Sequence, residues 1–108
     1  MFPKGGMGNI MKQAKEMQAK MAKAQEEVKL LNDEATSGGG LVKVCINGEK
    51  EITSISIDDE VLKEDKEVIE DLIIVAVNQA INNISKKIED TMNVATGGML
   101  GKGNFPGI

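Results

Sequence analysis

The chain has 108 residues and a net charge of −4, with no histidine and only two aromatic side chains. This length indicates a single domain, residues 1–108, whose small core would gain buried area by oligomerisation. The single cysteine excludes an internal disulfide, and no apolar run is long enough to span a bilayer. We therefore expect a cytoplasmic protein that has no contact with a membrane.

Charge is distributed unevenly along the chain. Residues 1–25 hold five lysines and one glutamate, a net +4, whereas residues 26–108 hold eight lysines and 16 acids, a net −8. Such asymmetry indicates a local surface for a polyanion. Lysines on an ordinary solvated helix face would give the same composition, so charge alone leaves both interpretations open.

Residues 10–31 are predicted to form a long amphipathic helix. Their apolar side chains alternate at spacings of four and three residues, which is the heptad pattern of a helix that packs along another helix. We call this row the seam; its members are Ile10, Ala14, Met17, Met21, Ala24, Val28 and Leu31. The helix cannot bury its seam alone, so the seam must pack on the chain's own fold, on a second copy, or on both.

The lysines of this helix are expected to lie away from the seam. A rotation of about 100° per residue places Lys12, Lys15, Lys20 and Lys23 in one broad sector roughly opposite it. Asn9 is the expected N-cap of the helix. Residues 1–8, which include Lys4, are expected to form a flexible lead-in.

A small antiparallel sheet is predicted in the middle of the chain. Residues 32–36 form either a short strand or an extended linker, and the glycines in residues 37–40 impose a turn. Residues 41–46 are predicted to form a strand whose Val42, Val44 and Ile46 share one face.

The dipeptide Asn47-Gly48 indicates a type I′ hairpin turn, in which both central residues need a positive φ. Alternation along the return strand then places Ile55 and Ile57 on one face and Ile52 on the other. We expect a helix to cover the first of these faces and an assembly to bury part of the second.

A second long helix is predicted over residues 65–94. Ile74 and Val75 make its middle apolar nearly all round, which a surface helix of a monomer seldom needs. One face should cover the sheet, and the other should meet the first helix or a second subunit. The glycine-rich residues 96–108 are expected to form a flexible tail.

Three segments resemble the YbaB/EbfC family of bacterial nucleoid-associated proteins. The sequence MFPKGGMGNIMKQA of residues 1–14 is very similar to the family's start. GGLVKV of residues 39–44, followed by Asn47-Gly48, resembles its most recognisable segment, and residues 57–72 fit its entry to the last helix. The matches run in order along essentially the whole chain.

This resemblance implies an α+β fold in which an α-β-β-β-α subunit joins a small antiparallel sheet to long N-terminal and C-terminal helices and forms a homodimer. It also implies a cytoplasmic, nucleoid-associated protein. Such a protein binds double-stranded DNA and alters its conformation, with roles in gene regulation and nucleoid organisation.

Charge and hydropathy patterns select the candidate residues. The candidate DNA contacts are Lys4, Lys12, Lys15, Lys20 and Lys23, and the candidate dimer or core residues are Ile10, Met17, Met21, Val28, Leu41, Ile52, Ile74 and Val75. The chain has no arginine, and lysine acts as a point charge without bidentate base readout, so we expect low sequence selectivity.

The alternative hypothesis is a structural or protein-interaction module whose seam docks a partner helix. An enzyme is the least expected class, because the chain lacks histidine, a nucleophile–base pair and a cluster of metal ligands. We accordingly predict no catalytic, cofactor-binding or metal-binding residues and no small-molecule substrate.

Overall fold

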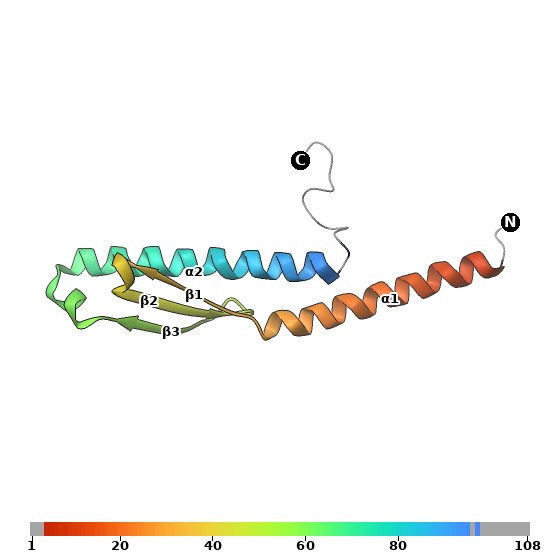
Figure 1. Ribbon diagram of the computed structural model, residues 1–108, viewed down its shortest axis with the longest axis horizontal. Helices are drawn as coiled ribbons and strands as arrows, with labels where there is room; N and C mark the ends of the chain where they lie inside the picture. Colours follow the sequence, from red (N-terminus) through yellow and green to blue (C-terminus); the bar gives the residue numbers. More distant parts are fainter. Residues whose placement is uncertain (1–3, 96, 98–108) are drawn as a thin grey trace, which may run out of the picture.

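Two long helices and a three-stranded sheet make up the fold. The structure is a computed structural model that describes residues 4–95 and 97. Its elements are α1 (Lys4–Lys29), β1 (Asn32–Ser37), the 3₁₀ turn η1 (Gly38–Gly40), β2 (Val42–Asn47), β3 (Ile52–Ile57), the 3₁₀ turn η2 (Asp59–Lys63) and α2 (Lys66–Ala95). The α+β class and the α-β-β-β-α order are confirmed (Figure 1).

The molecule is elongated because its helices are long and overlap only in part. Its extents are 75 × 31 × 16 Å. In Figure 1, α2 runs along the sheet and past its end, and α1 starts far from the sheet and ends near the same end of it. The N-terminal part of α1 therefore projects beyond the rest of the protein.

α2 packs on one face of the sheet, over β1 and β2. The strands are ordered β1-β2-β3, and both pairs are antiparallel. The core joins alternate residues of β2 to one stripe of α2: Val42, Val44 and Ile46 meet Ala76, Ala80 and Ile84. The two alanines allow the helix backbone to approach the sheet closely, and the predicted apolar face of β2 is confirmed.

Side-chain hydrogen bonds tie one flank of α2 to β1. The Ser37 hydroxyl donates to the backbone carbonyl of Leu72 at 2.6 Å, and the Asn83 amide donates to the carbonyl of Glu34 at 3.2 Å. The Lys87 amine donates to the carbonyl of Asn32 at 2.9 Å. Residues 32–36, which the sequence predicts as either a strand or a linker, are thus held as a strand between β2 and this flank.

β3 extends beyond the cover of α2, and its isoleucines remain exposed. Val44 pairs with Ile55 and Val42 pairs with Ile57, so both isoleucines lie on the α2 side of the sheet. Ile55 is nevertheless 46% exposed, because α2 lies over the other two strands.

A β-bulge places Ile52 on the opposite face of the sheet from the one predicted. Cys45 pairs with Ser54 but Ile46 pairs with Ile52, so Thr53 is an extra residue in β3. Strict alternation places Ile52 on the face away from Ile55 and Ile57, and that prediction is wrong. The extra residue brings Ile52 to the same face as the buried Ile46.

The predicted type I′ turn is also wrong. Four residues separate β2 from β3, and the only residue of this loop with a positive φ is Lys50, at 62°. The Asn47 side chain organises the loop, because its Oδ1 accepts hydrogen bonds from the backbone N–H groups of Glu49 at 2.9 Å and Glu51 at 3.0 Å. Asparagine thus acts as a hydrogen-bond acceptor here rather than as a left-handed turn residue.

Gly48 is needed for a different reason, which is the approach of α1. Its N–H donates to the carbonyl of Leu31 at 2.9 Å, and a Cβ at this position would collide with the backbone carbonyl of Val28. The hairpin loop therefore packs directly against the end of α1. Only a residue without a side chain fits this contact.

The start of α1 differs from the prediction. The helix begins at Lys4, so Asn9 lies inside it instead of capping it, and residues 4–8 of the expected lead-in form its first turns. Glycine lowers helix propensity without preventing helical geometry. Residues 1–3 of the lead-in, and residues 96 and 98–108 of the expected tail, lie outside the described residues.

We predict that Gly48→Ala destabilises the protein by about 1–3 kcal/mol, the usual cost of forcing atoms into a filled space. Thermal unfolding monitored by circular dichroism measures this destabilisation. Gly8→Ala is the matched control, because a Cβ there has no neighbour within 4 Å. Equal stability of the two variants would contradict the proposed contact between the hairpin and α1.

Candidate nucleic-acid interface

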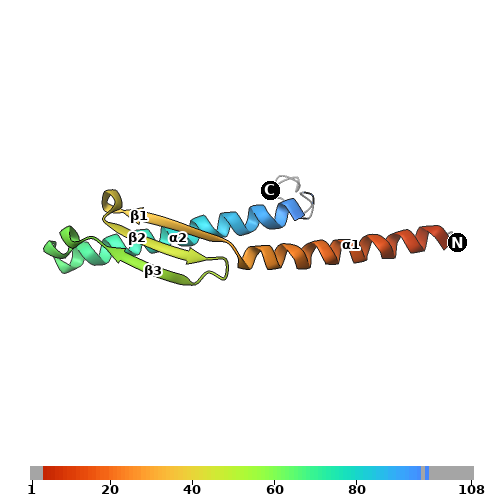
Figure 2. The same ribbon diagram turned by 60° about the horizontal axis from the view of Figure 1, so that its bottom comes forward.

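The C-terminal half of α1 packs against the end of α2. Ala24 of the seam is only 1% exposed, and Met21, Val28 and Leu31 are half-buried. This part of α1 lies beside the last turns of α2, which extend past the sheet (Figures 1 and 2). The chain's own fold therefore covers this half of the seam.

Among the described residues, no other element packs over the N-terminal half of the same seam. Ile10 is 62% exposed, Ala14 is exposed, and Met17 is half-buried. The structure thus divides the predicted seam into a packed half and a bare half. We call the part of α1 from Gly8 to Ala19 the arm.

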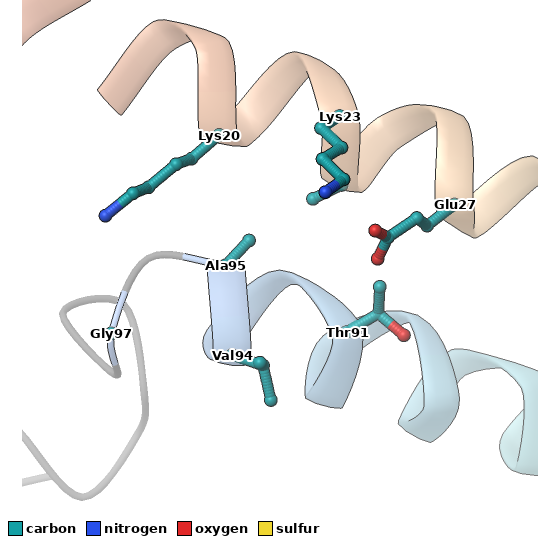
Figure 3. A pocket seen from close by; sticks show the side chains of 8 residues that line it. Lys20, Lys23, Glu27, Thr91, Val94, Ala95 and Gly97 are labelled. Carbon is teal, nitrogen blue, oxygen red and sulfur yellow. The ribbon is translucent and has the colours of Figure 1, made fainter. Parts of the chain in front are cut away.

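A crevice of about 330 Å³ lies where α1 meets the end of α2. It is lined by Lys20, Lys23, Ala24, Glu27, Thr91, Val94, Ala95 and Gly97. Figure 3 shows Glu27 pointing from α1 toward Thr91 of α2, while the Lys20 side chain extends past the end of α2. Because a helix C-terminus carries partial negative charge, it favours lysine amines nearby.

The four helix lysines therefore fall into two pairs. Lys12 and Lys15 are exposed on the arm, whereas Lys20 and Lys23 line the crevice. The prediction that all four lie opposite the seam is too simple, because Lys20 and Lys23 flank its packed half. Lys4 begins α1, and only its backbone position is described.

None of these four amines is paired with a carboxylate of the described residues. Ion pairs involve Lys29, Lys43, Lys63 and Lys87 instead. The amine of Lys43, for example, lies 3.1 Å from Glu34, and the hydrogen bond and charge of Glu34 raise the pKa of Lys43. Lys12, Lys15, Lys20 and Lys23 thus remain available to an external anion.

Acidic residues gather at the opposite end of the molecule. Asp58, Asp59, Glu60, Glu64, Asp65 and Glu67 lie at η2 and at the start of α2. Figure 1 shows this region at the far end of the sheet from α1. Six of the chain's 17 acidic residues are therefore separated in space from the α1 lysines, whereas Glu27 lines the crevice beside Lys20 and Lys23.

Two other features, a metal site and a membrane-spanning helix, find no support in the residues that the structure describes. Within residues 4–95 and 97, no three cysteine or acidic side chains are placed to hold a metal ion. In the same residues, no helix is both long and apolar enough to cross a membrane.

Comparison with known proteins identifies the family. The family model described as the YbaB/EbfC DNA-binding family matches residues 4–99. The chain belongs to this family. The resemblance noted in the sequence is thereby confirmed, and YbaB/EbfC membership gives the protein a nucleoid-associated, DNA-binding role.

A solved relative shares the fold of this YbaB/EbfC protein. It is the uncharacterized protein HP0035 from Helicobacter pylori, whose crystal structure matches with a TM-score of 0.60 and 27% sequence identity. The match covers 72% of this chain and 92% of that chain. The shared architecture thus extends over nearly all of the Helicobacter protein.

The crevice is not evident from the sequence. Lys20 and Lys23 are recognisable as basic, but nothing in their spacing shows where α2 ends. One signal is present: α2 is much longer than the six-residue strands it covers, so one of its ends must extend past the sheet.

We predict that Ala24→Asp in this YbaB/EbfC protein releases the end of α1 from α2, because an unpaired carboxylate is costly to bury. Hydrogen exchange should become faster in residues 20–28 and 91–95 and stay slow in β2. Ala22→Asp, at an exposed position of α1, is the control. If both variants exchange alike, Ala24 does not hold the two helices together.

Proposed function

We propose that the protein binds double-stranded DNA through the lysines of α1, as a homodimer and with low sequence selectivity. The observation that carries this proposal is the set of four exposed lysines without carboxylate partners among the described residues, at one end of the molecule. They are Lys12, Lys15, Lys20 and Lys23. Alteration of DNA conformation, nucleoid organisation and gene regulation belong to the same proposal.

Phosphate neutralisation explains how this surface binds DNA. Each lysine that meets a phosphate releases condensed counterions, which gives affinity that falls as salt rises. The acidic end would be repelled by DNA, so the molecule should approach with α1 foremost. Lysine amines and the absence of arginine favour contacts to the backbone over readout of bases.

An apolar face formed by β3 and α2 supports a homodimer. Ile52, Ile55 and Ile57 lie on the α2 side of β3, and all three are exposed. The flank of α2 opposite the one bound to β1 carries Ile74, which is 55% exposed, and Ile81. An exposed apolar face of this kind marks an interaction site, and β3 adds a free strand edge.

The other candidate dimer residues lie elsewhere. Leu41 packs on the core of its own subunit. Val75 is exposed, but the helical rotation from Ile74 directs it toward the β1 side of α2. Within the proposed dimer face, Ile52 and Ile74 are therefore the two predicted positions that remain.

We predict that charge reversal in Lys12→Glu/Lys15→Glu/Lys20→Glu/Lys23→Glu strongly weakens DNA binding at low salt. Milder lysine-to-glutamine changes should lower the slope of log affinity against log salt by about 0.9 for each phosphate that is no longer neutralised. Gel shifts across salt concentrations with competitor DNA measure both effects.

Lys50→Glu/Lys66→Glu/Lys86→Glu provides the control, because these lysines lie on the body of the protein and also form no ion pair with the described residues. Unchanged affinity in the α1 variant, with circular dichroism showing an intact fold, would refute the α1 surface. A stoichiometric protein partner without any DNA shift would favour the interaction-module hypothesis.

We also predict that Ile74→Asp shifts the protein from dimer to monomer, because a carboxylate in an apolar interface loses its hydration without gaining a partner. Analytical ultracentrifugation should show the dissociation constant rising by about tenfold or more, equivalent to about 1.4 kcal/mol. Leu30→Asp, at a more exposed leucine outside this face, should leave the dimer intact. A dimer that tolerates Ile74→Asp and Ile55→Asp must use another surface.

A further inference from the structure

The bare half of the seam has the pattern of a surface that binds a helix. Its residues Ile10, Ala14 and Met17 continue, without a break in spacing, the row that packs Ala24 against α2. Heptad spacing suits a helical partner, and the packed half of the seam already contacts one. The bare half is therefore expected to bind another helix.

No helix of the described residues in the same subunit is free to bind there. α2 ends at Ala95, beside Lys20 and Lys23 in the crevice, so it does not reach the arm. The sequence of residues 98–108 is rich in glycine, which gives it low helix propensity. The helix that carries a matching bare seam is α1 of a second copy.

The flanks of the bare seam permit self-association. Met11, Gln13 and Gln18 border it and are uncharged, whereas Lys12 and Lys15 project away from it by helical rotation. Two such arms could meet without bringing like charges together. Their lysines would stay exposed on the outside of the pair.

We propose that the arm, through Ile10, Ala14 and Met17, packs antiparallel against the arm of a second copy. The end of α2 occupies the seam side of α1 from about Met21 onward. In a parallel pair the two α2 ends would meet at the same level and collide. An antiparallel pair places them at opposite ends and sets Ile10 opposite Ala14 of the second copy.

The arm pair goes beyond the proposed DNA binding and does not depend on it. Three seam side chains give a small contact, so association should be weak in dilute solution and stronger when molecules are held close together. Where the proposed DNA binding also holds, paired arms would connect two DNA-bound molecules. The association itself is testable on the protein alone.

Crosslinking tests the pair and its direction. Two variants, Ile10→Cys and Ala14→Cys, are made separately in a Cys45→Ser background, and one of them carries a tag that changes its size. The two variants are co-expressed and then treated with a short bismaleimide in the absence of DNA. The antiparallel pair predicts mixed crosslinks between the two variants in several-fold excess over crosslinks within either one. Predominant Ala14→Cys self-crosslinks would overturn the antiparallel arrangement.

A second substitution tests the seam itself. Met17→Glu, added to both cysteine variants, should lower the yield of mixed crosslinks about tenfold, whereas Ala19→Glu, on the opposite side of the arm, should leave it unchanged. Equal yields of mixed crosslinks with the two glutamate substitutions would overturn the proposal. An Ala19→Cys variant gives the background of self-crosslinks, and mixed crosslinks no more abundant than this background would also overturn it. Reversal of Lys12 and Lys15 should preserve the crosslinks, which separates this result from any failure of DNA binding.

Discussion

The packing of α2 against β2 determines the position of the other elements. Ala76 and Ala80 bring the helix close to Val42, Val44 and Ile46, which are fully buried. A helix of 30 residues is about 45 Å long, but strands of six residues reach only about 20 Å. Most of the second half of α2 therefore extends past the sheet, and this overhang is what holds α1.

α2 lies over β1 and β2 and not over β3, and this position determines which apolar side chains stay exposed. Hydrogen bonds from Ser37, Asn83 and Lys87 hold the helix toward β1, so it leaves β3 exposed at the other edge. The isoleucines of β3 and the free flank of α2 then form one apolar face. A single packing arrangement thus produces both the proposed dimer face and the support for the projecting arm.

α1 combines two kinds of surface along one helix. Its lysines favour a polyanion, and its seam favours other helices, first α2 and then the proposed arm of a second copy. The two surfaces do not compete, because Lys12 and Lys15 point away from Ile10 and Met17. The acids at η2 and the start of α2 lie at the far end of the molecule from α1, so this acidic cluster does not oppose the approach of a polyanion to Lys12 and Lys15.

The sequence by itself determined the apolar face of β2 and the heptad seam, because these depend on local periodicity. Short segments in a fixed order pointed to the family, and only that resemblance implied the α-β-β-β-α order, since residues 32–36 alone fitted either a strand or a linker. Only the tertiary structure decided where the seam is covered, that Lys20 and Lys23 line a crevice, and that a bulge turns Ile52 to the α2 side. Those features depend on the length by which α2 exceeds the sheet and on strand register. Gly48 shows the difference most clearly: its dipeptide suggested a local turn, but the residue is required because the distant carbonyl of Val28 lies against it.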